Sequence, residues 1–323
     1  MKVYVSRPIP QNAYKILKDA GLEVFANEEN RILSKQELIE NIKDVDALLP
    51  LLTDAIDDEV LASNPKLKIV ANYAVGFNNI NIEAATKRGI LVTNTPDVLT
   101  DTTADMAFAL LMTTARSIVP SDKFTRDGMF DKWEPLGFLG QDIHHATLGI
   151  IGAGRIGQVV AKRGHHGFDM KILYVDMSHN EYMDSELGAT KVELDYLLQN
   201  SDFVSLHVPL FPNTHHLIGK DQFKMMKKTA VLINTARGPV VDEEALVEAL
   251  KTGEIWAAGL DVYEKEPTVH HELLKMDNVV LAPHIASASI QTREEMGRIA
   301  AENIVLFLNG KKPLTPVNPA VLQ

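Results

Sequence analysis

The stretch Leu148-Gly-Ile-Ile-Gly-Ala-Gly-Arg-Ile-Gly157 decides the fold. Its glycines follow the pattern G-x-G-x-x-G at Gly152, Gly154 and Gly157. A helix-like segment, 158–166, follows, and then an apolar run, 171–175, ends in Asp176. Alone, the glycine pattern is a weak signal. Here it stands in the order strand, glycine-rich turn, helix, strand and acid, and this order predicts a dinucleotide-binding unit. The alternative is a strand–helix–strand unit whose glycines serve packing only.

Each part of this unit has a physical purpose. Gly152 permits the tight turn, Gly154 lets backbone approach a pyrophosphate, and Gly157 lets the helix pack on the strand. The N-terminus of the helix offers free amides and a positive dipole end to the phosphates. Asp176 can accept hydrogen bonds from the adenosine ribose hydroxyls and would repel a 2′-phosphate, so the sequence favours NAD over NADP.

The composition is that of an ordinary globular protein. The 323 residues suggest two domains, with 46% hydrophobic and 23% charged residues. A formal net charge of −11 and the lack of a long basic run argue against nucleic acid or an anionic membrane as partner. The absence of cysteine excludes disulfides and thiolate chemistry. No signal-peptide pattern and no apolar run of about 18 residues is present, so we expect a cytoplasmic protein.

Strand-like and helix-like segments alternate along the chain, which predicts parallel α/β sheets. The expected fold is two doubly wound, Rossmann-like parallel-sheet domains that flank an active-site cleft. Residues 1–100 with 288–323 would form a flavodoxin-like substrate domain, and 101–287 a dinucleotide-binding domain. The segment 102–119 reads as one buried helix linking the domains. The long amphipathic segment 290–308 comes after the last strand, so we expect it to return to the first domain.

Two local features add detail to this organisation. Ser34-x-x-Glu37 is the pattern of a capping box and predicts a helix that extends to about Lys43. The stretch 128–145 is irregular and contains Trp133. Because a loop this long inside a compact protein usually has a function, we interpret it as a dimerisation arm that reaches a second subunit, and we expect a homodimer.

Three polar side chains follow three successive predicted strands of the second domain. Arg237 follows 231–236, Glu266 comes after 259–263, and His284 follows 279–283. The carboxyl ends of parallel strands meet at one edge, where ligands bind in such sheets. Singly, each side chain has a plain surface interpretation; together they predict a reaction centre. The adjacent histidine pairs lack a third ligand at a suitable spacing, so we predict no metal site.

Several motifs resemble the D-isomer-specific 2-hydroxyacid dehydrogenase family in order and spacing, over essentially the whole chain. They are Gly149–Gly157, His207-Val-Pro-Leu210, Ile233-Asn-Thr-Ala-Arg-Gly238, Gly259-Leu-Asp-Val262 with Glu266-Pro267, and Ala282-Pro-His-Ile285. The chain looks most similar to the glyoxylate/hydroxypyruvate reductase branch through Asp97-Val-Leu-Thr-Asp-Thr-Thr-Ala104 and Trp133-Glu-Pro-Leu136.

The resemblance implies roles for the three polar residues. Arg237 would clamp the substrate carboxylate and polarise the 2-keto oxygen, since a guanidinium fork suits a carboxylate. His284, protonated, would donate the proton as hydride arrives from the nicotinamide. Glu266 would hydrogen-bond the other imidazole nitrogen, fix the tautomer and keep the acid form available near neutrality.

The resemblance also implies further contacts. The backbone of Val75 and Gly76 would bind the substrate carboxylate from the first domain, Ser287 would help to position substrate, and Trp133 would reach a neighbouring subunit's pocket. Contacts to the cofactor are implied for Thr103, Gly152, Gly154, Arg155, Ile156, Gly157, Asp176, Pro209, Thr214, Ala236 and Asp261, with Asp261 on the carboxamide.

Two departures from the family pattern bear on specificity. Asp176 is followed by Met177-Ser178-His179 rather than by basic residues, which favours NAD, while His179 leaves some tolerance for NADP. Ala74 stands where a serine is common. The expected function is NAD(H)-dependent reduction of a small 2-oxoacid, glyoxylate or hydroxypyruvate, to the D-2-hydroxy acid. The alternatives are a 2-ketogluconate or broad-specificity D-2-hydroxyacid reductase and a non-catalytic NAD-sensing scaffold.

Overall fold

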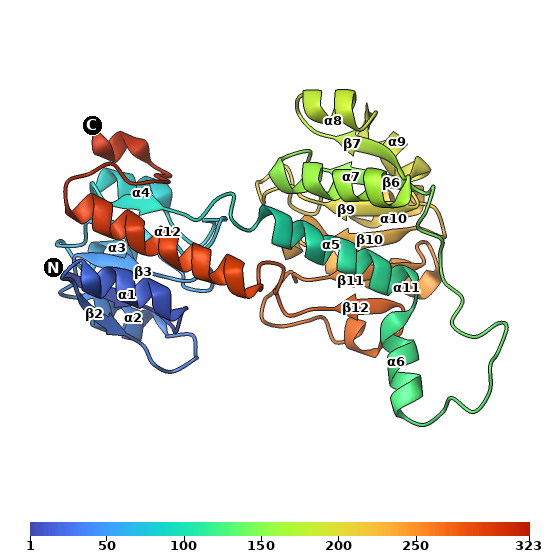
Figure 1. Ribbon diagram of the computed structural model, residues 1–323, viewed down its shortest axis with the longest axis horizontal. Coiled ribbons are helices and arrows are strands. Elements are labelled where there is room, and N and C mark those ends of the chain that lie inside the picture. The colour runs from blue at the N-terminus through green and yellow to red at the C-terminus, as the bar shows by residue number, and fades with distance from the viewer. The chain divides into compact units, whose positions relative to one another are not determined.

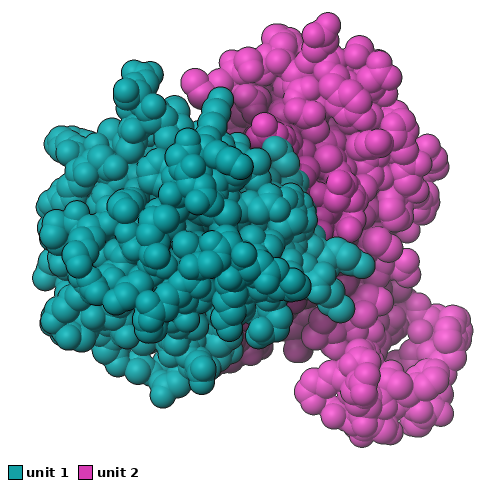
Figure 2. All heavy atoms as spheres, turned by 60° about the vertical axis from the view of Figure 1, so that its left-hand side comes forward, with its two compact units in different colours: residues 1–99, 287–323 teal, residues 100–286 magenta.

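The computed structural model describes residues 1–323, which form two compact units (Figures 1 and 2). The first unit contains residues 1–99 and 287–323, and the second contains residues 100–286. None of the helices is both long and apolar enough to cross a bilayer.

The first unit is built on a five-stranded parallel sheet in the order β2-β1-β3-β4-β5. Its strands are β1 (Lys2–Val5), β2 (Glu23–Ala26), β3 (Ala47–Leu49), β4 (Ile69–Ala71) and β5 (Leu91–Thr93). Its helices are α1 (Gln11–Asp19), α2 (Lys35–Ile42), α3 (Asp58–Ala62), α4 (Ile82–Lys87) and α12 (Ile290–Leu308), followed by the 3-10 turn η3 (Pro319–Leu322). The strand order reverses between β1 and β3, which is the doubly wound pattern of flavodoxin-like sheets.

The last long helix packs on the first sheet, as expected from its position in the sequence. Met296, Ala300 and Ile304 of α12 share one apolar core with the β1 residues Val3 and Val5. α12 and α1 approach closely, since a Cβ atom at Gly297 would lie 3.2 Å from the Cβ of Ala13. The predicted bounds 290–308 coincide with those of the helix.

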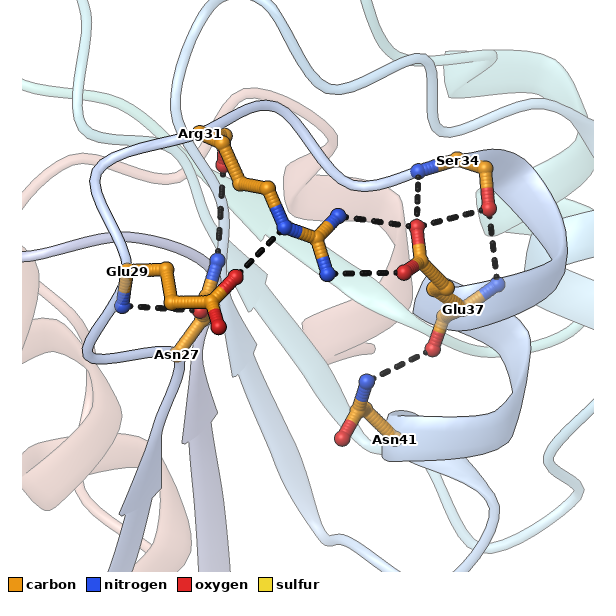
Figure 3. Close-up of polar contacts among 6 residues, drawn as sticks. All are labelled: Asn27, Glu29, Arg31, Ser34, Glu37 and Asn41. Atoms are coloured by element: carbon orange, nitrogen blue, oxygen red, sulfur yellow. Dashed lines mark hydrogen bonds and ion pairs between the residues drawn. The ribbon is translucent and has the colours of Figure 1, made fainter.

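Helix α2 begins at the polar network that Figure 3 shows. The predicted capping box is confirmed: Ser34 Oγ accepts from the Glu37 amide, and Glu37 Oε2 accepts from the Ser34 amide at 2.8 Å. Arg31 donates to both carboxylate oxygens of Glu37, at 3.1 and 2.8 Å, and its Nε donates to Glu29 at 2.6 Å. The hydrogen bond from Arg31 is the main cause that lowers the pKa of Glu37 to about 2. Arg31 is thus fully paired with carboxylates.

The second unit is built on a seven-stranded parallel sheet in the order β12-β11-β10-β9-β6-β7-β8. Its strands are β6 (Thr147–Ile151), β7 (Lys171–Val175), β8 (Thr190–Lys191), β9 (Phe203–Leu206), β10 (Val231–Asn234), β11 (Ala257–Leu260) and β12 (Val279–Leu281). Its helices are α5 (Thr100–Ala115), α6 (Ile118–Arg126), α7 (Arg155–Phe168), α8 (Glu181–Glu186), α9 (Leu194–Asn200), α10 (Lys220–Met225) and α11 (Glu243–Thr252), with the 3-10 turns η1 (Gly238–Val240) and η2 (Leu273–Lys275). The order reverses between β6 and β9, so both sheets confirm the predicted doubly wound fold class.

The segment between α5 and β6 differs from the prediction. The single helix expected over 102–119 ends at Ala115, because Ser117 adopts a left-handed conformation with φ 51°. The separate helix α6 that follows buries none of its residues, and 127–146 contains neither helix nor strand. Large exposed apolar side chains gather in this region: Ile118, Val119, Met129, Phe130, Trp133, Leu136, Phe138 and Leu139. In Figure 1, α6 and the loop after it extend away from the rest of the second unit.

Candidate active site

The turn after β6 is shaped by two close approaches of backbone. Gly152 has φ +97°, and a Cβ atom there would lie 2.8–2.9 Å from backbone atoms of His207 and Val208. A Cβ atom at Gly157 would lie 2.1 Å from the carbonyl oxygen of Gly152. By contrast, the Cβ position of Gly154 faces open space. The turn therefore has room for a ligand at Gly154, directly before the first backbone amides of α7.

Asp176 follows β7 and braces this turn. Its Oδ2 accepts a hydrogen bond from the amide of Ala153 at 2.8 Å, and the side chain of Asn180 donates to the Ala153 carbonyl at 2.7 Å. Asp176 is half-buried. Because a carboxylate offers about four acceptor positions, Asp176 can support the turn and still accept from a ligand hydroxyl.

The other residues with implied cofactor contacts lie on several elements of the second unit. Thr103 is buried on α5, and Ala236 is buried just after β10. After β9, the hydroxyl of Thr214 donates to the carbonyl of Pro209 at 2.7 Å and accepts from the Phe211 amide at 2.7 Å. This loop is therefore held in one shape by the Thr214 side chain.

Arg237 lies in a turn after β10 that packs directly on the loop after β11. A Cβ atom at the next residue, Gly238, would lie 1.8 Å from the carbonyl oxygen of Tyr263, so only glycine fits there. The Arg237 side chain donates to the Ala236 carbonyl at 2.6 Å. Burial lowers the pKa of the Arg237 guanidinium, while the charge of Glu266 acts in the opposite direction. A guanidinium remains charged in proteins, so the turn holds a half-buried cation.

Glu266 and His284 form a hydrogen-bonded pair. Glu266 Oε2 lies 2.8 Å from His284 Nδ1, and Glu266 Oε1 accepts from the Tyr263 amide at 3.1 Å. Both side chains are 27% exposed. Burial alone would raise the pKa of Glu266, but the hydrogen bond and charge of His284 outweigh it, and the pKa lies below its usual value. The carboxylate therefore stays ionised at neutral pH beside the imidazole.

Asp261 holds the backbone that carries His284. His284 has φ +56°, a conformation uncommon outside glycine, and the next two amides point to Asp261. Ile285 donates to Asp261 Oδ1 at 2.7 Å and Ala286 donates to Oδ2 at 2.8 Å. Burial raises the pKa of Asp261, against these two hydrogen bonds. Sequence reasoning missed this positioning role, although the motif Gly259-Leu-Asp-Val262 marked the residue.

In the first unit, the turn after β4 presents free backbone amides. The carbonyls of Val75 and Gly76 accept from the side chains of Asn94 and Asn72, each at 2.8 Å. The amides of Val75 and Gly76 donate to no group of the protein. Successive unpaired amides in a turn form an anion-binding concavity. Ser287, at the start of the unit's second segment, accepts from the Ser289 amide at 3.1 Å.

The sequence also led to predictions for Trp133 and for a metal site, and both concern residues away from the Arg237, Glu266 and His284 groups. Trp133 is 79% exposed in the irregular segment 127–146. No three His, Asp or Glu side chains are arranged to hold a metal ion. The structure thus joins Glu266 and His284 by a hydrogen bond and places Arg237 within electrostatic reach of Glu266.

The second unit combines a doubly wound sheet with a glycine-rich turn and an acid after the next strand. It also carries an Arg, a Glu and a His at later strand ends. This combination defines the class of nicotinamide-dependent dehydrogenases. Residues 108–286 match the family model of the D-isomer specific 2-hydroxyacid dehydrogenase NAD binding domain. The chain belongs to this family, so it is an oxidoreductase that acts on CH–OH groups and has an NAD-binding domain. The resemblance drawn from the sequence is confirmed.

Relatives and solved structures agree with this assignment. The chain is 52% identical to a glyoxylate reductase of Pyrococcus horikoshii, over 100% of this chain and 97% of that protein. It is 43% identical to a protein of Thermus thermophilus, with a TM-score of 0.93 and coverage of 98% and 100%. An NADPH-dependent glyoxylate/hydroxypyruvate reductase of Sinorhizobium meliloti is 33% identical, with a TM-score of 0.85 and coverage of 99% and 98%.

Proposed function

We propose that the protein reduces glyoxylate or hydroxypyruvate to the D-2-hydroxy acid with NADH. The observation that carries the proposal is the pair of Glu266 and His284, 2.8 Å apart, within reach of the Arg237 charge. Similarity over the full chain to proteins named glyoxylate reductase supports the choice of substrate.

Residues of the second unit fit a bound dinucleotide. The open space at Gly154 and the first amides of α7 suit a pyrophosphate, and Asp176 suits a ribose. We assign further contacts to Thr103, Pro209, Thr214, Ala236 and Asp261. NADH supplies the hydride when bound. We therefore assign cofactor binding to residues 100–286, and we assign residues 1–99 with 287–323 to substrate binding, to which Arg237 and His284 also contribute.

In the proposed reaction, Arg237, Glu266 and His284 of the second unit each have one role. Arg237 binds the substrate carboxylate and polarises the 2-oxo group. His284 gives a proton to the 2-oxo oxygen as carbon 2 receives the hydride, so the product is a neutral hydroxyl. Glu266 fixes the proton of the imidazole on Nδ1, which leaves Nε2 for the substrate, and its charge stabilises the imidazolium.

Residues of the first unit would bind the same class of substrate. The free amides of Val75 and Gly76 suit a carboxylate, and we assign Ser287 to substrate positioning. We further propose that the protein is a homodimer whose arm, 128–145, carries Trp133 to a neighbouring subunit. The exposed apolar side chains of this region support that proposal.

We propose NAD as the preferred cofactor because the charge of Asp176 repels a 2′-phosphate. A rate comparison with NADH and NADPH over glyoxylate, hydroxypyruvate, pyruvate and 2-ketogluconate tests both cofactor and substrate. Faster turnover with NADPH than with NADH would contradict the cofactor assignment. No oxidation of either cofactor with any of the four acids would favour the non-catalytic scaffold.

Arg237→Ala and His284→Ala test the reaction centre. We expect each to lower kcat by about 10²- to 10⁴-fold, the usual contribution of a positioned acid–base group. NADH binding, followed by fluorescence, should persist. Arg126→Ala and His271→Ala are matched controls on exposed side chains and should turn over normally. Normal turnover in both site variants would refute the proposed function.

A further inference from the structure

Arg7, directly after β1 and Ser6, is a half-buried cation without a counter-ion. Its Nε is buried and has no hydrogen-bond partner. One terminal nitrogen donates to Thr53 Oγ1 at 3.3 Å, and no carboxylate forms an ion pair with it. Arg31 of the same unit, by contrast, is exposed and paired with two carboxylates (Figure 3). Because withdrawing a charge from water is costly unless it is paired, Arg7 is suited to a partner that the chain does not supply.

The carboxylate that is bonded to the neighbouring Ser6 is committed to other groups. Asp54 is 3% exposed, and its Oδ2 accepts hydrogen bonds from Ser6 Oγ and from the Leu51 amide. This carboxylate therefore fixes the loop after β3 rather than neutralising Arg7. The remaining N–H donors on the terminal nitrogens of Arg7 are available to a ligand oxygen.

Arg7 lies at the edge of the sheet where ligands bind. β1 and β3 are neighbours at the reversal of strand order, and the Val75–Gly76 turn follows β4, which is next to β3. Adjacent strands are about 4.8 Å apart, so β1 and β4 are about 10 Å apart. That separation is within the combined reach of an arginine side chain and a three-carbon acid.

Hydrogen bonds join the loop beside Arg7 to the turn that has free amides. The side chain of Asn79 donates to the carbonyls of Leu51 and Asp54, at 3.2 and 3.1 Å. Asn79 also accepts from Asn72 at 3.2 Å, and Asn72 donates to the Gly76 carbonyl at 2.8 Å. The Thr53 partner of Arg7 is thus part of the same frame as the anion-binding turn.

We propose that Arg7 determines specificity by binding an oxygen on carbon 3 of a 2-oxoacid whose carboxylate lies on the amides of Val75 and Gly76. A guanidinium fork donates well to such an oxygen. The inference rests on the proposed function and narrows its substrate class to 3-hydroxy-2-oxoacids, of which hydroxypyruvate is the smallest. Pyruvate differs from it by that one oxygen, and glyoxylate lacks carbon 3 altogether, so glyoxylate serves as an internal control.

The test is kcat/KM for hydroxypyruvate, pyruvate and glyoxylate in the wild type, Arg7→Met, Arg7→Lys and the control Arg31→Met. We expect Arg7→Met to lower the ratio of hydroxypyruvate to pyruvate by about 10- to 100-fold, as for loss of a charged hydrogen bond. Activity on glyoxylate should change by less than about threefold. Arg7→Lys should keep part of the ratio, and Arg31→Met should keep all of it.

Two outcomes overturn the proposal: an unchanged ratio in Arg7→Met, or an equal loss on all three substrates, which indicates a structural role. If Arg7→Met does not fold, the comparison of Arg7→Lys with wild type decides. If the wild type reduces none of the acids, the proposed function fails separately. Titration of the wild type and Arg7→Met with D-glycerate and D-lactate then tests Arg7. The proposal requires that the wild type binds D-glycerate more tightly than D-lactate and that Arg7→Met loses this preference.

Discussion

The turn after β6 and the turn after β4 both present backbone amides at the carboxyl edge of a parallel sheet, but they are built differently. The first depends on the absence of side chains: Gly152 and Gly157 allow backbone to approach backbone. The second depends on side chains, because Asn72 and Asn94 hold the carbonyls of Gly76 and Val75. One turn continues into the fourteen-residue helix α7, whereas the other is followed by a loop that leads to α4.

This difference explains why the first turn is visible in a local sequence pattern, whereas the second was marked only by the resemblance to a family. A turn that needs glycine at fixed spacing leaves a local pattern, and a following helix and acid strengthen it. A turn held by asparagines leaves scattered polar residues that read as ordinary loop. The two constructions also fail in different ways when they are altered, which the following substitutions exploit.

Among the substitutions in these two turns, Gly152→Ala is expected to have the largest effect, which is on NADH affinity. A methyl group at this position meets three backbone atoms under 3.0 Å, and φ +97° is strained for alanine. Each effect costs about 1 to 3 kcal/mol, so NADH affinity, measured by fluorescence titration, should fall by at least about 30-fold. Gly167→Ala is the control, because its Cβ position is open and its φ is ordinary. An unchanged NADH affinity in Gly152→Ala would show that the turn does not bind the cofactor.

A smaller effect is expected at the acid that braces the same turn. Asp176→Asn keeps an acceptor for the Ala153 amide and removes only the charge, so the ratio of NADPH to NADH activity should rise by about tenfold. Asp176→Ala also removes the brace and should weaken NADH binding further. Equal cofactor ratios in wild type and Asp176→Asn would show that the charge plays no part in cofactor choice.

The fold was largely predictable because its signals are local and repeated. Alternating apolar and helical segments predicted two parallel sheets, and the position of 290–308 after the last strand predicted its return to the first sheet. The short elements α8 and β8 were missed, since six and two residues carry too little periodicity. The helix break at Ser117 was missed because this residue adopts φ 51° without the glycine that usually marks a left-handed position in a sequence.

The candidate site was predictable where chemistry follows a strand end, as at Arg237 and His284. Residues that act by holding others were not. Asp261 binds amides more than twenty positions away in sequence, and Asn72 acts on a turn through a side chain that looks like ordinary loop polarity. Arg7 reads as a surface arginine until its missing counter-ion is known. Such roles depend on contacts between distant segments, which one sequence does not record.

The smallest effect, and the sharpest test of the comparison, is expected from Asn72→Ala. This fully buried side chain donates to Gly76 and to Asn79, so its loss frees the turn after β4 without touching the second unit's sheet. Each lost hydrogen bond is worth about 0.5 to 1.5 kcal/mol, so KM for glyoxylate should rise by about five- to tenfold. NADH affinity should stay constant, in contrast to Gly152→Ala. Asn41→Ala, which removes an exposed 2.7 Å bond to Glu37 in the same unit, is the control. If Asn72→Ala weakened NADH as much as it raised KM, the substitution would act through general unfolding, and the separate role of the β4 turn would be refuted.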